Sequence, residues 1–223
     1  QVADPGTRPG RAVRALILGV TGQTGSYLAE HLLAEGHEVF CSIRTARRYP
    51  APDGVIRVAA DLLDPPSLER VLTYAQPHEI YNLAAVTAPG GAWGTRQPPL
   101  LGDVTALGPV RLLDAVLKIC PDARVVHASS SAIFDPHRYG LYGISKQFAH
   151  EAVIGYRSQL HVSNAVLYSH TSPRQDRRFL APTIAATVAR AARGENVRLR
   201  LTDVKGVRDW GYAPDYARAL PLI

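Results

Sequence analysis

The segment from Val13 to Gly36 constrains the fold more strongly than any other stretch of this sequence. It begins with six residues that are apolar apart from Arg14 and suit a buried strand, continues into a turn with three glycines, and ends as a helix pattern. Gly19 permits a tight exit from the strand, Gly22 lets backbone N–H groups approach a pyrophosphate, and Gly25 lets the helix pack against a sheet. Because a helix N-terminus favours an anion, the segment predicts a dinucleotide-binding turn. Glycines that serve only the turn are the alternative.

Strand and helix patterns alternate along the rest of the chain. Strands are expected over 37–43, 55–60, 79–83 and 124–128, and helices after Asp64, over 101–119 and over 142–156. Residues 86–99 contain too much Gly and Pro for regular structure and form a candidate substrate-facing loop. The alternation predicts an α/β fold with a doubly wound parallel sheet, a Rossmann fold, that binds ligands at the carboxyl ends of its strands.

Length and composition limit the remaining classes. The 223 residues suffice for one α/β domain, expected at 13–168, between a flexible tail at 1–12 and a substrate-side segment at 169–223. No run of about 18 to 20 apolar residues and no signal-peptide pattern occurs, so we expect no membrane partner.

The cysteines, histidines and charges exclude further classes of site. Cys41 and Cys120 are the only cysteines, which indicates a reducing, cytoplasmic compartment and excludes a disulfide framework and a thiolate zinc site. The histidines form no helical ligand pair, so no metal is expected. The net charge of +6 is spread along the chain rather than clustered with aromatic residues, so we expect no nucleic-acid partner.

The end of the second expected strand indicates which dinucleotide is bound. Arg44 follows this strand, and no acidic residue stands there to accept hydrogen bonds from the ribose hydroxyls of NAD. An arginine accommodates the 2′-phosphate of NADP, so NADP is favoured over NAD. A solvated basic loop with no role in binding is the alternative. Asp61, after the third expected strand, is placed either to accept a hydrogen bond from the adenine amino group or to cap the helix that follows.

Tyr142 and Lys146 carry the predicted chemistry. They lie four residues apart on one expected helix and therefore share a face. An ammonium group beside a phenol favours the phenolate, so Lys146 is expected to lower the pKa of Tyr142 toward the working pH. Such a tyrosine can exchange a proton with a sugar hydroxyl while hydride moves to or from a nicotinamide. A serine after the fifth expected strand would hydrogen-bond the same oxygen.

Together these features resemble the extended short-chain dehydrogenase/reductases, the NAD-dependent epimerase/dehydratase family, and within it the GDP-mannose 4,6-dehydratases. The matching stretches are GVTGQTGSYLAEHLL at 19–33, EIYNLAA at 79–85, RLLDAV at 111–116, YGISK at 142–146, HTSPR at 170–174 and RDWGYAPDY at 208–216. The last is the most discriminating, because the glycine turn and YxxxK occur throughout the wider superfamily. The resemblance implies a tightly held NADP, a nucleotide-diphosphate sugar as substrate, above all a GDP-sugar, and a homodimer or higher homo-oligomer built through the helices near 101–119 and 142–156.

Carried over position by position, the resemblance makes Tyr142 the acid/base residue, tuned by Lys146, with the hydroxyl of Ser130 beside it. Arg174 and Arg208 suit a diphosphate through their guanidinium forks, although each also fits a surface arginine. The implied cofactor-binding residues are Gly19, Thr21, Gly22, Gln23, Thr24, Gly25, Arg44, Asp61, Leu62, Leu83, Ala84, Ala85, Tyr142, Lys146 and His170, the last of which also fits a structural histidine; the implied substrate-binding residues are Thr87, Ser131, Arg174 and Arg208.

Three departures from the family pattern limit the predicted reaction. Ala132 occupies the position of the glutamate with which a 4,6-dehydratase removes the C5 proton, and a methyl group transfers no proton. The nearest downstream carboxylate is Asp135, three residues away. Only 12 positions separate Ser130 from Tyr142, where family members insert a longer loop, and the chain ends at Ile223, where they continue with a segment that completes the sugar-nucleotide pocket.

The sequence therefore predicts an NADP-dependent nucleotide-sugar oxidoreductase that transfers hydride at a C4-type sugar carbon. The missing glutamate favours chemistry of the reductase or epimerase type. A true 4,6-dehydratase with a relocated acid and a non-catalytic NADP-binding homologue are the alternatives.

Overall fold

The computed structural model describes residues 12–43, 51–86, 98–201 and 205–223. Its main sheet holds six parallel strands in the order β3-β2-β1-β4-β5-β6. The strands are β1 Arg14–Leu18, β2 Glu38–Ser42, β3 Ile56–Val58, β4 Glu79–Asn82, β5 Arg124–Ser130 and β6 Val162–Leu167. Since the order proceeds outward from β1 and then reverses to β4, the sheet is doubly wound, and the predicted Rossmann fold is confirmed.

The helices connect and cover these strands. They are α1 Gln23–Ala34, α2 Pro65–Ala75, α3 Pro98–Gly102, α4 Gly108–Ile119, α5 Gly140–Tyr156, α6 Leu180–Ala192 and α7 Ala213–Ala219. A π-helical stretch, Asp103–Leu107, joins α3 to α4, and short 3-10 helices cover Ser131–Phe134, Pro136–Tyr139 and Leu220–Leu222. Local sequence sets several ends: α2 starts on Pro65, whose missing N–H is not needed in a first turn, and Gly36 follows α1 with a φ of 81°.

Several predicted boundaries are wrong by a few residues. The third strand covers Ile56–Val58 rather than 55–60, and the fifth runs to Ser130 rather than to 128, because Ser129 and Ser130 still pair with β6. The helix expected over 101–119 begins at Pro98, inside the expected loop, and its course is interrupted by the π-helical stretch. Proline is compatible with the first turn of a helix, so the prediction of a loop from the Pro content of residues 86–99 placed the helix start too late. The helix expected from 142 begins at Gly140.

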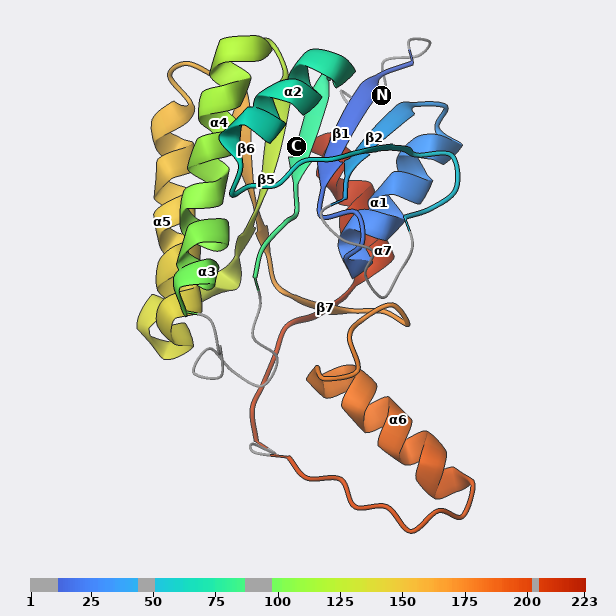
Figure 1. Cartoon of the computed structure of the whole chain (residues 1–223). Coiled ribbons are helices and arrows are strands. Elements are labelled where there is room, and N and C mark those ends of the chain that lie inside the picture. The colour runs from blue at the N-terminus through green and yellow to red at the C-terminus, as the bar shows by residue number, and fades with distance from the viewer. Residues whose placement is uncertain (1–11, 44–50, 87–97, 202–204) are drawn as a thin grey trace, which may run out of the picture.

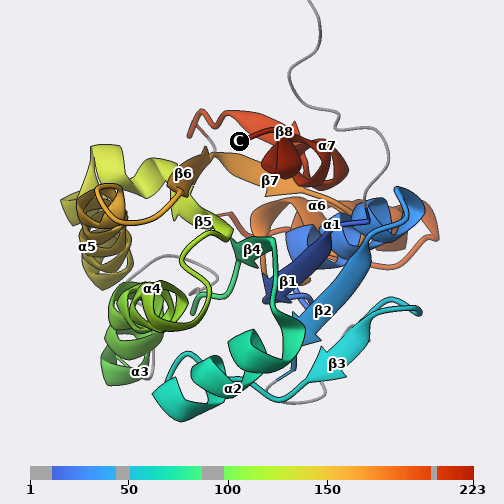
Figure 2. The same ribbon diagram turned by 90° about the horizontal axis from the view of Figure 1, so that it is seen from above.

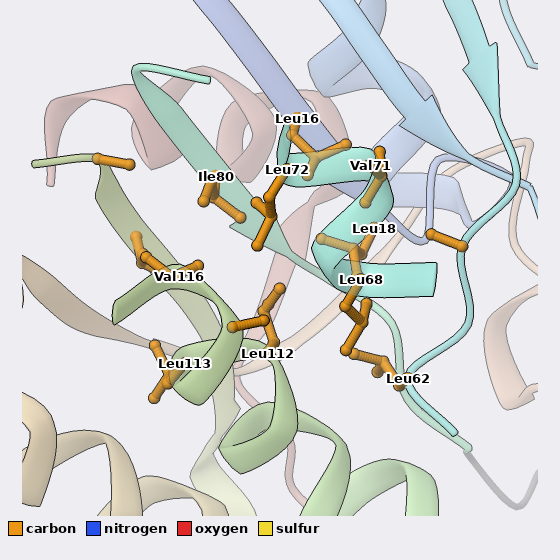
Figure 3. Close-up of a cluster of buried hydrophobic side chains, with 14 of the residues drawn as sticks. Leu16, Leu18, Leu62, Leu68, Val71, Leu72, Ile80, Leu112, Leu113 and Val116 are labelled. Carbon is orange, nitrogen blue, oxygen red and sulfur yellow. The ribbon is translucent and has the colours of Figure 1, made fainter. Parts of the chain in front are cut away.

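The sheet is covered on both faces. Helices α2, α4 and α5 lie on one side, and α1 and α7 on the other (Figures 1 and 2). Figure 3 shows the cluster on the first side, in which side chains from β1 and β4 pack against α2 and α4. Its buried members include Leu16, Leu18, Leu68, Leu72, Ile80, Leu112, Leu113 and Val116. The strands are largely apolar, as expected of a parallel sheet covered on both faces, although β4 and β5 also carry the buried polar residues Asn82 and His127.

Residues 169–223 carry a second, two-stranded sheet, in which β7 Ser169–Thr171 pairs in parallel with β8 Trp210–Tyr212. Between these strands α6 extends away from the main sheet and buries none of its residues (Figure 1). No helix in the described ranges is long and apolar enough to cross a membrane.

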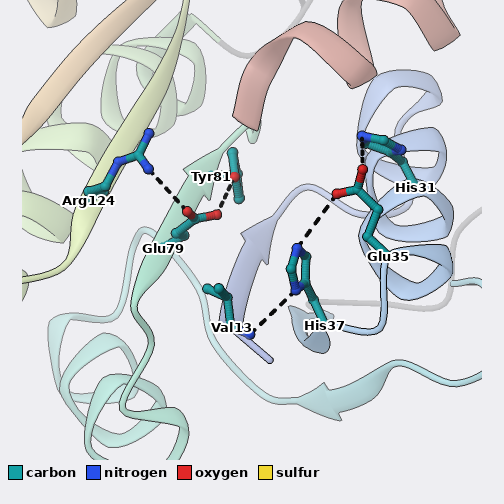
Figure 4. Close-up of polar contacts among 7 residues, drawn as sticks. All are labelled: Val13, His31, Glu35, His37, Glu79, Tyr81 and Arg124. Carbon is teal, nitrogen blue, oxygen red and sulfur yellow. Dashed lines mark hydrogen bonds and ion pairs between the residues drawn. The ribbon is translucent and has the colours of Figure 1, made fainter. Parts of the chain in front are cut away.

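Polar contacts occupy the amino-terminal edge of the sheet (Figure 4). The Tyr81 hydroxyl donates to Glu79 Oε2 at 2.6 Å, and Arg124 forms an ion pair with Glu79 Oε1 at 3.3 Å. Nearby, the Val13 N–H donates to His37 Nδ1 at 3.4 Å. These contacts join β1, β4 and β5 to their neighbours at the end of the sheet opposite to the glycine turn.

Candidate active site

The glycine turn follows β1 at the point where the strand order reverses. Gly19 has a φ of 92°, and a Cβ added there would lie 2.8 Å from the backbone N of Ala84 and 2.9 Å from the carbonyl carbon of Leu83. A Cβ on Gly25 would overlap with the carbonyl oxygen of Gly19. Both positions therefore require glycine, because the turn, the start of α1 and the end of β4 approach one another at backbone distance.

The residues around this turn keep its shape without a side-chain cap. The Gly22 N–H donates to the Gly19 carbonyl oxygen at 3.0 Å, and Gly22 itself occupies the N-cap of α1. The Leu83 N–H donates to the Leu18 carbonyl oxygen at 2.9 Å, so Leu83, Ala84 and Ala85 leave the sheet directly beside the turn. The dinucleotide cradle predicted from the sequence thus has a backbone geometry suited to it.

Asp61 and Leu62 lie in the connection between β3 and α2. One carboxylate oxygen of Asp61 accepts from the Leu63 N–H at 3.0 Å, and its backbone N–H donates to the Ser67 hydroxyl at 3.0 Å. Asp64, not Asp61, occupies the N-cap of α2. The side chain of Leu62 is only 3% exposed and belongs to the core. Asp61 therefore does not cap α2, as one of the two alternatives had it, and its carboxylate instead closes a local turn after β3. Its contact with an adenine stays a prediction.

Ser130 and Tyr142 meet where β5 ends and α5 begins, and Lys146 lies one helical turn further along α5. Ser130 is the last residue of β5, and its Oγ accepts from the Ala132 N–H at 3.2 Å. The Ser130 and Tyr142 side chains are hydrogen-bonded to each other. Because Ala132 already donates to the Ser130 oxygen, the hydrogen of the Ser130 hydroxyl is available for the Tyr142 oxygen.

Lys146 lies one turn after Tyr142 and is 4% exposed. Its Nζ donates to the Ala128 carbonyl oxygen at 2.7 Å, and burial lowers its pKa to about 8. Gly143 supports this arrangement, since a Cβ there would overlap with the carbonyl oxygen of Pro136. The close approach lets the short connection between β5 and α5 pack against the helix that carries both residues.

The expected lowering of the Tyr142 pKa is wrong. Burial raises the pKa of Tyr142 above its ordinary value of 10.0, and the hydrogen bond from Ser130 offsets only part of this effect. The charge of Lys146 is directed at the Ala128 carbonyl, whereas spacing alone suggested that it would face the phenol. A tyrosine in this environment stays protonated, which suits a proton donor.

The side chain of Ala132 is a buried methyl group, which has no proton to exchange with a ligand. Ala132 lies in the 3-10 helix Ser131–Phe134 and is 2% exposed, and Ser131 begins that helix as a partly buried residue. Asp135 follows the helix and is exposed. His127, which precedes the serines, is buried within β5.

Gln23, Thr24 and His170 form one hydrogen-bonded group. The Thr24 hydroxyl lies 2.8 Å from His170 Nε2, and His170 Nδ1 lies 2.8 Å from the Tyr168 carbonyl oxygen. Since a carbonyl only accepts, Nδ1 carries the proton and Nε2 accepts from Thr24. The Gln23 amide donates to the His170 carbonyl oxygen at 3.1 Å. His170 lies in β7, and burial lowers its pKa.

The motif RDWGYAPDY contributes a residue that the sequence did not single out. The ring of Tyr216 stacks on His170 with centroids 4.7 Å apart. A Cβ on Gly211 would overlap with this tyrosine ring, so Gly211 in β8 allows the ring to reach β7. Ser172 was also missed, and its hydroxyl donates to Gln23 Oε1 at 2.9 Å. The position of both residues inside the matching motifs was the available signal.

Arg174 and Arg208 are not brought together. The guanidinium of Arg174 contacts three residues of α1: it donates to Ser26 Oγ at 3.0 Å, pairs with Glu30 Oε1 at 2.6 Å and lies 4.0 Å from the ring centroid of Tyr27. Arg208 is exposed and donates to the neighbouring Val207 carbonyl oxygen.

Three further predictions concern residues that lie partly or wholly outside the described ranges. Arg44 and Thr87 lie outside the described residues, as does most of the expected tail at 1–12. Thr21 lies in the glycine turn and is partly buried. Among the described residues no group of histidine, cysteine and carboxylate side chains could hold a metal ion.

Comparison with known proteins gives one consistent result. The family model for GDP-mannose 4,6 dehydratase matches residues 16–223. A GDP-mannose 4,6-dehydratase of Vibrio cholerae is 33% identical over 239 aligned residues, which cover 92% of this chain and 62% of that relative. The chain thus spans less than two thirds of the relative's length.

Solved structures of similar proteins share the fold. The UDP-glucose 4-epimerase of Thermus thermophilus, in complex with NAD, has a TM-score of 0.77 and 28% identity, covering 94% of this chain and 73% of that one. MoeE5, in complex with UDP-glucuronic acid and NAD, has a TM-score of 0.75 and 26% identity, covering 93% of this chain and 71% of that one.

Proposed function

Because the chain belongs to the GDP-mannose 4,6-dehydratase family, we propose that it is an NADP-dependent enzyme that reduces, oxidises or epimerises a nucleotide-diphosphate sugar, and that it does not use residue 132 for dehydration. One observation carries this proposal: the Ser130 side chain hydrogen-bonds to Tyr142 at the carboxyl end of β5, and Lys146 follows one helical turn later on α5.

The residues around the glycine turn fit a dinucleotide. Gly19 and Gly25 leave no room for a Cβ, and the small residue Ala84 passes beside them, so a ligand can lie against bare backbone. The turn and the start of α1 would hold the pyrophosphate, and Asp61 would face the adenine. When bound, the nicotinamide supplies the hydride acceptor or donor. The choice of NADP over NAD is supported by Arg44 alone.

Tyr142 would act as the acid/base residue. The phenol would donate a proton to a sugar carbonyl oxygen as that carbon is reduced. Burial raises its pKa, so the phenol is protonated before this step. Ser130 donates to the same tyrosine oxygen and stabilises the charge that develops on it. Lys146 lies one helical turn after Tyr142. Its hydrogen bond to the Ala128 carbonyl oxygen would hold its positive charge on the same side of α5 as the phenol.

Ala132 argues against elimination of water by the family's route. Its methyl group is buried and carries no proton, and Asp135 is exposed beyond the end of the same 3-10 helix. Hydride transfer at a C4-type carbon needs neither residue. A GDP-sugar is the proposed substrate, with Ser131 and Arg208 as candidate contacts, whereas Arg174 would first have to leave Glu30.

A homodimer through α4 and α5 is part of the proposal. Leu141, Ile144 and Phe148 on α5 are exposed by 38%, 45% and 48%, and they follow one another at helical spacing. Exposed apolar side chains at such spacing suit a helix partner from a second copy. The double variant Ile144→Glu, Phe148→Glu should be monomeric in light scattering, and a wild-type monomer would refute the dimer.

The test of the reaction incubates the protein with NADP⁺ or NADPH and with GDP-mannose, its 4-keto derivative or UDP-glucose. Nicotinamide absorbance and mass spectrometry of the sugar should show hydride transfer that Tyr142→Phe abolishes. A 4-keto-6-deoxy product would show that Ala132 does not prevent dehydration. Binding of NADPH without turnover of any of these sugars would favour a binding protein instead. Arg44→Ala should lower the affinity for NADPH but not for NADH.

A further inference from the structure

His170 lies between the two halves of the candidate site. Its Nε2 accepts from the hydroxyl of Thr24, in the first turn of α1, at 2.8 Å. Its Nδ1 donates to the Tyr168 carbonyl oxygen at 2.8 Å. Burial lowers the pKa of His170, so near neutral pH the ring is uncharged and has one donor and one acceptor. Both ring nitrogens therefore have protein partners, and the ring joins two segments of the protein instead of offering a nitrogen to a ligand.

On one side of His170, the start of α1 is bound to β7. The Gln23 amide donates to the His170 carbonyl oxygen at 3.1 Å, and Gln23 Oε1 accepts from the Ser172 hydroxyl at 2.9 Å. The hydroxyl hydrogen of Thr24 points toward β7 as well, since it is donated to His170. An anion at the glycine turn would then be held by the free backbone N–H groups of the helix start, while these side chains set where β7 lies relative to it.

On its other side, His170 reaches the element that follows Ser130. Tyr168 is the residue after β6, and the centroid of its ring lies 6.5 Å from that of Phe134. Phe134 ends the 3-10 helix Ser131–Phe134, whose first residue directly follows Ser130. Contacts thus run without a break from the first turn of α1, through β7, to the 3-10 helix beside the candidate acid/base pair.

Tyr216, in the motif RDWGYAPDY, fixes the plane of the His170 ring. The two rings stack with centroids 4.7 Å apart and an angle of 21° between their planes. Gly211, in the same motif, leaves the space that the tyrosine ring occupies. A stack of this kind restricts rotation of the imidazole, so that each nitrogen stays directed at its partner. The most discriminating motif of the sequence therefore contacts the candidate site through one histidine.

We propose that His170 is a positioning residue that sets the separation between a dinucleotide at the glycine turn and the Ser130–Tyr142 pair, and that Tyr216 holds it in this role. The inference rests on the proposed function, because hydride transfer requires the nicotinamide and the sugar carbon to approach within about 3–3.5 Å. A shift of about 1 Å between the two halves would slow that step about 100-fold, although each half could still bind its own ligand. Loss of the His170 contacts should therefore lower kcat far more than it weakens binding.

Nuclear magnetic resonance on the ¹⁵N-labelled protein, without substrate or cofactor, tests the contacts themselves. We expect His170 to be neutral with its proton on Nδ1, and this proton to exchange slowly with solvent. Tyr216→Leu removes the stacked ring and should speed the exchange severalfold, whereas Tyr216→Phe keeps the ring and should restore the slow rate. An Nε2–H tautomer, or equal exchange rates in Tyr216→Leu and the wild type, would overturn the proposal.

Kinetics with NADPH and the 4-keto derivative of GDP-mannose test the positioning role. His170→Phe keeps an aromatic ring for the stack but removes both hydrogen bonds, so kcat should fall about 10- to 100-fold while the Kd of NADPH and the KM of the sugar nucleotide stay nearly unchanged. Tyr216→Leu should show the same division between kcat and KM, and Tyr216→Phe should recover most of the lost kcat. His161→Phe, which removes an exposed histidine, is the control and should behave like the wild type.

Two kinetic results would contradict the positioning role. An unchanged kcat in His170→Phe would show that the contacts do not matter for the reaction, and a Kd of NADPH that rises as much as kcat falls would make His170 a cofactor-binding residue instead. Absence of hydride transfer in the wild type would refute the proposed function, and the positioning role with it. A wild type that transfers hydride but has the Nε2–H tautomer would refute the positioning role alone, so the two failures are distinguishable.

Discussion

Replacement of Lys146 by methionine should change how the stability of the protein depends on pH while removing the proposed chemistry. Burial lowers the Lys146 pKa from 10.5 to about 8. At about 1.4 kcal/mol per tenfold change in proton affinity, the charged form therefore costs the fold about 3 kcal/mol. Methionine keeps most of the volume, but it leaves the Ala128 carbonyl oxygen without a donor, which costs about 1–3 kcal/mol. The net effect at neutral pH is small, so its pH dependence is the decisive quantity.

The sign of this dependence follows from the proton count. Between about pH 8 and 10.5 the unfolded chain keeps the Lys146 proton and the folded protein loses it, so wild-type stability from this group rises with pH. The advantage of Lys146→Met over the wild type should therefore shrink by about 1.4 kcal/mol for each pH unit across this window. The lost hydrogen bond to Ala128 contributes a constant offset that does not alter the slope.

Urea unfolding of the cofactor-free protein between pH 7 and 9.5 measures this difference. Taking variant minus wild type at each pH cancels the other groups that titrate in this range, such as Cys41 and Cys120, whose pKa values burial raises to about 11. Lys118→Met is the matched control, because the pKa of exposed Lys118 is raised by Asp114 and its difference should stay flat over this range. A flat difference for Lys146→Met as well would refute the assignment of a strongly lowered pKa.

Two further substitutions separate packing from ligand binding. Gly25→Ala should lower the free energy of unfolding by about 1–3 kcal/mol, because its Cβ would overlap with the Gly19 carbonyl oxygen. It should also weaken NADPH binding in a fluorescence titration. The control Gly155→Ala has open space around it and should instead stabilise the helix by up to about 1 kcal/mol. Arg174→Met should lower the free energy of unfolding by about 1 kcal/mol. In a double-mutant cycle, Arg174→Met should cost less when Glu30→Gln is already present, because the ion pair is then already broken. An unchanged stability combined with a raised KM for the sugar nucleotide would show that Arg174 binds substrate instead.

The glycine turn was predictable because its determinants are local. Gly19, Gly22 and Gly25 lie within seven consecutive residues, and the backbone geometry that needs them is set within the same strand, turn and helix. The spacing of Tyr142 and Lys146 likewise placed both residues on α5. The parallel sheet followed from the alternation of apolar runs and amphipathic segments. The five strands with predicted bounds were wrong only near their ends, whereas β6 was given no bounds.

The contacts that join distant segments were not predictable in this way. Arg174 meets Glu30, and Thr24 meets His170, across 144 and 146 residues of sequence. Periodicity reports which face of an element is apolar, but it says nothing about which polar side chains meet across two elements. The prediction of a lowered Tyr142 pKa was wrong for a related reason, since the spacing indicates a neighbouring lysine but not the burial of the phenol.

Ala132→Glu offers the sharpest test of the proposal that Ala132 stands in the position of the family's glutamate. The change restores the acid by sequence, yet the Ala132 side chain is 2% exposed and sits in a 3-10 helix whose first N–H bond ends on Ser130. A carboxylate forced into that position would be unpaired and would cost several kcal/mol, or the helix would have to open and release Ser130 from its present bond. We therefore expect a destabilised protein with slower hydride transfer and no 4-keto-6-deoxy sugar, as measured by thermal unfolding and by mass spectrometry of the product. Dehydration by a variant of wild-type stability would show instead that the pocket is built for the acid and that position 132 alone decides the reaction.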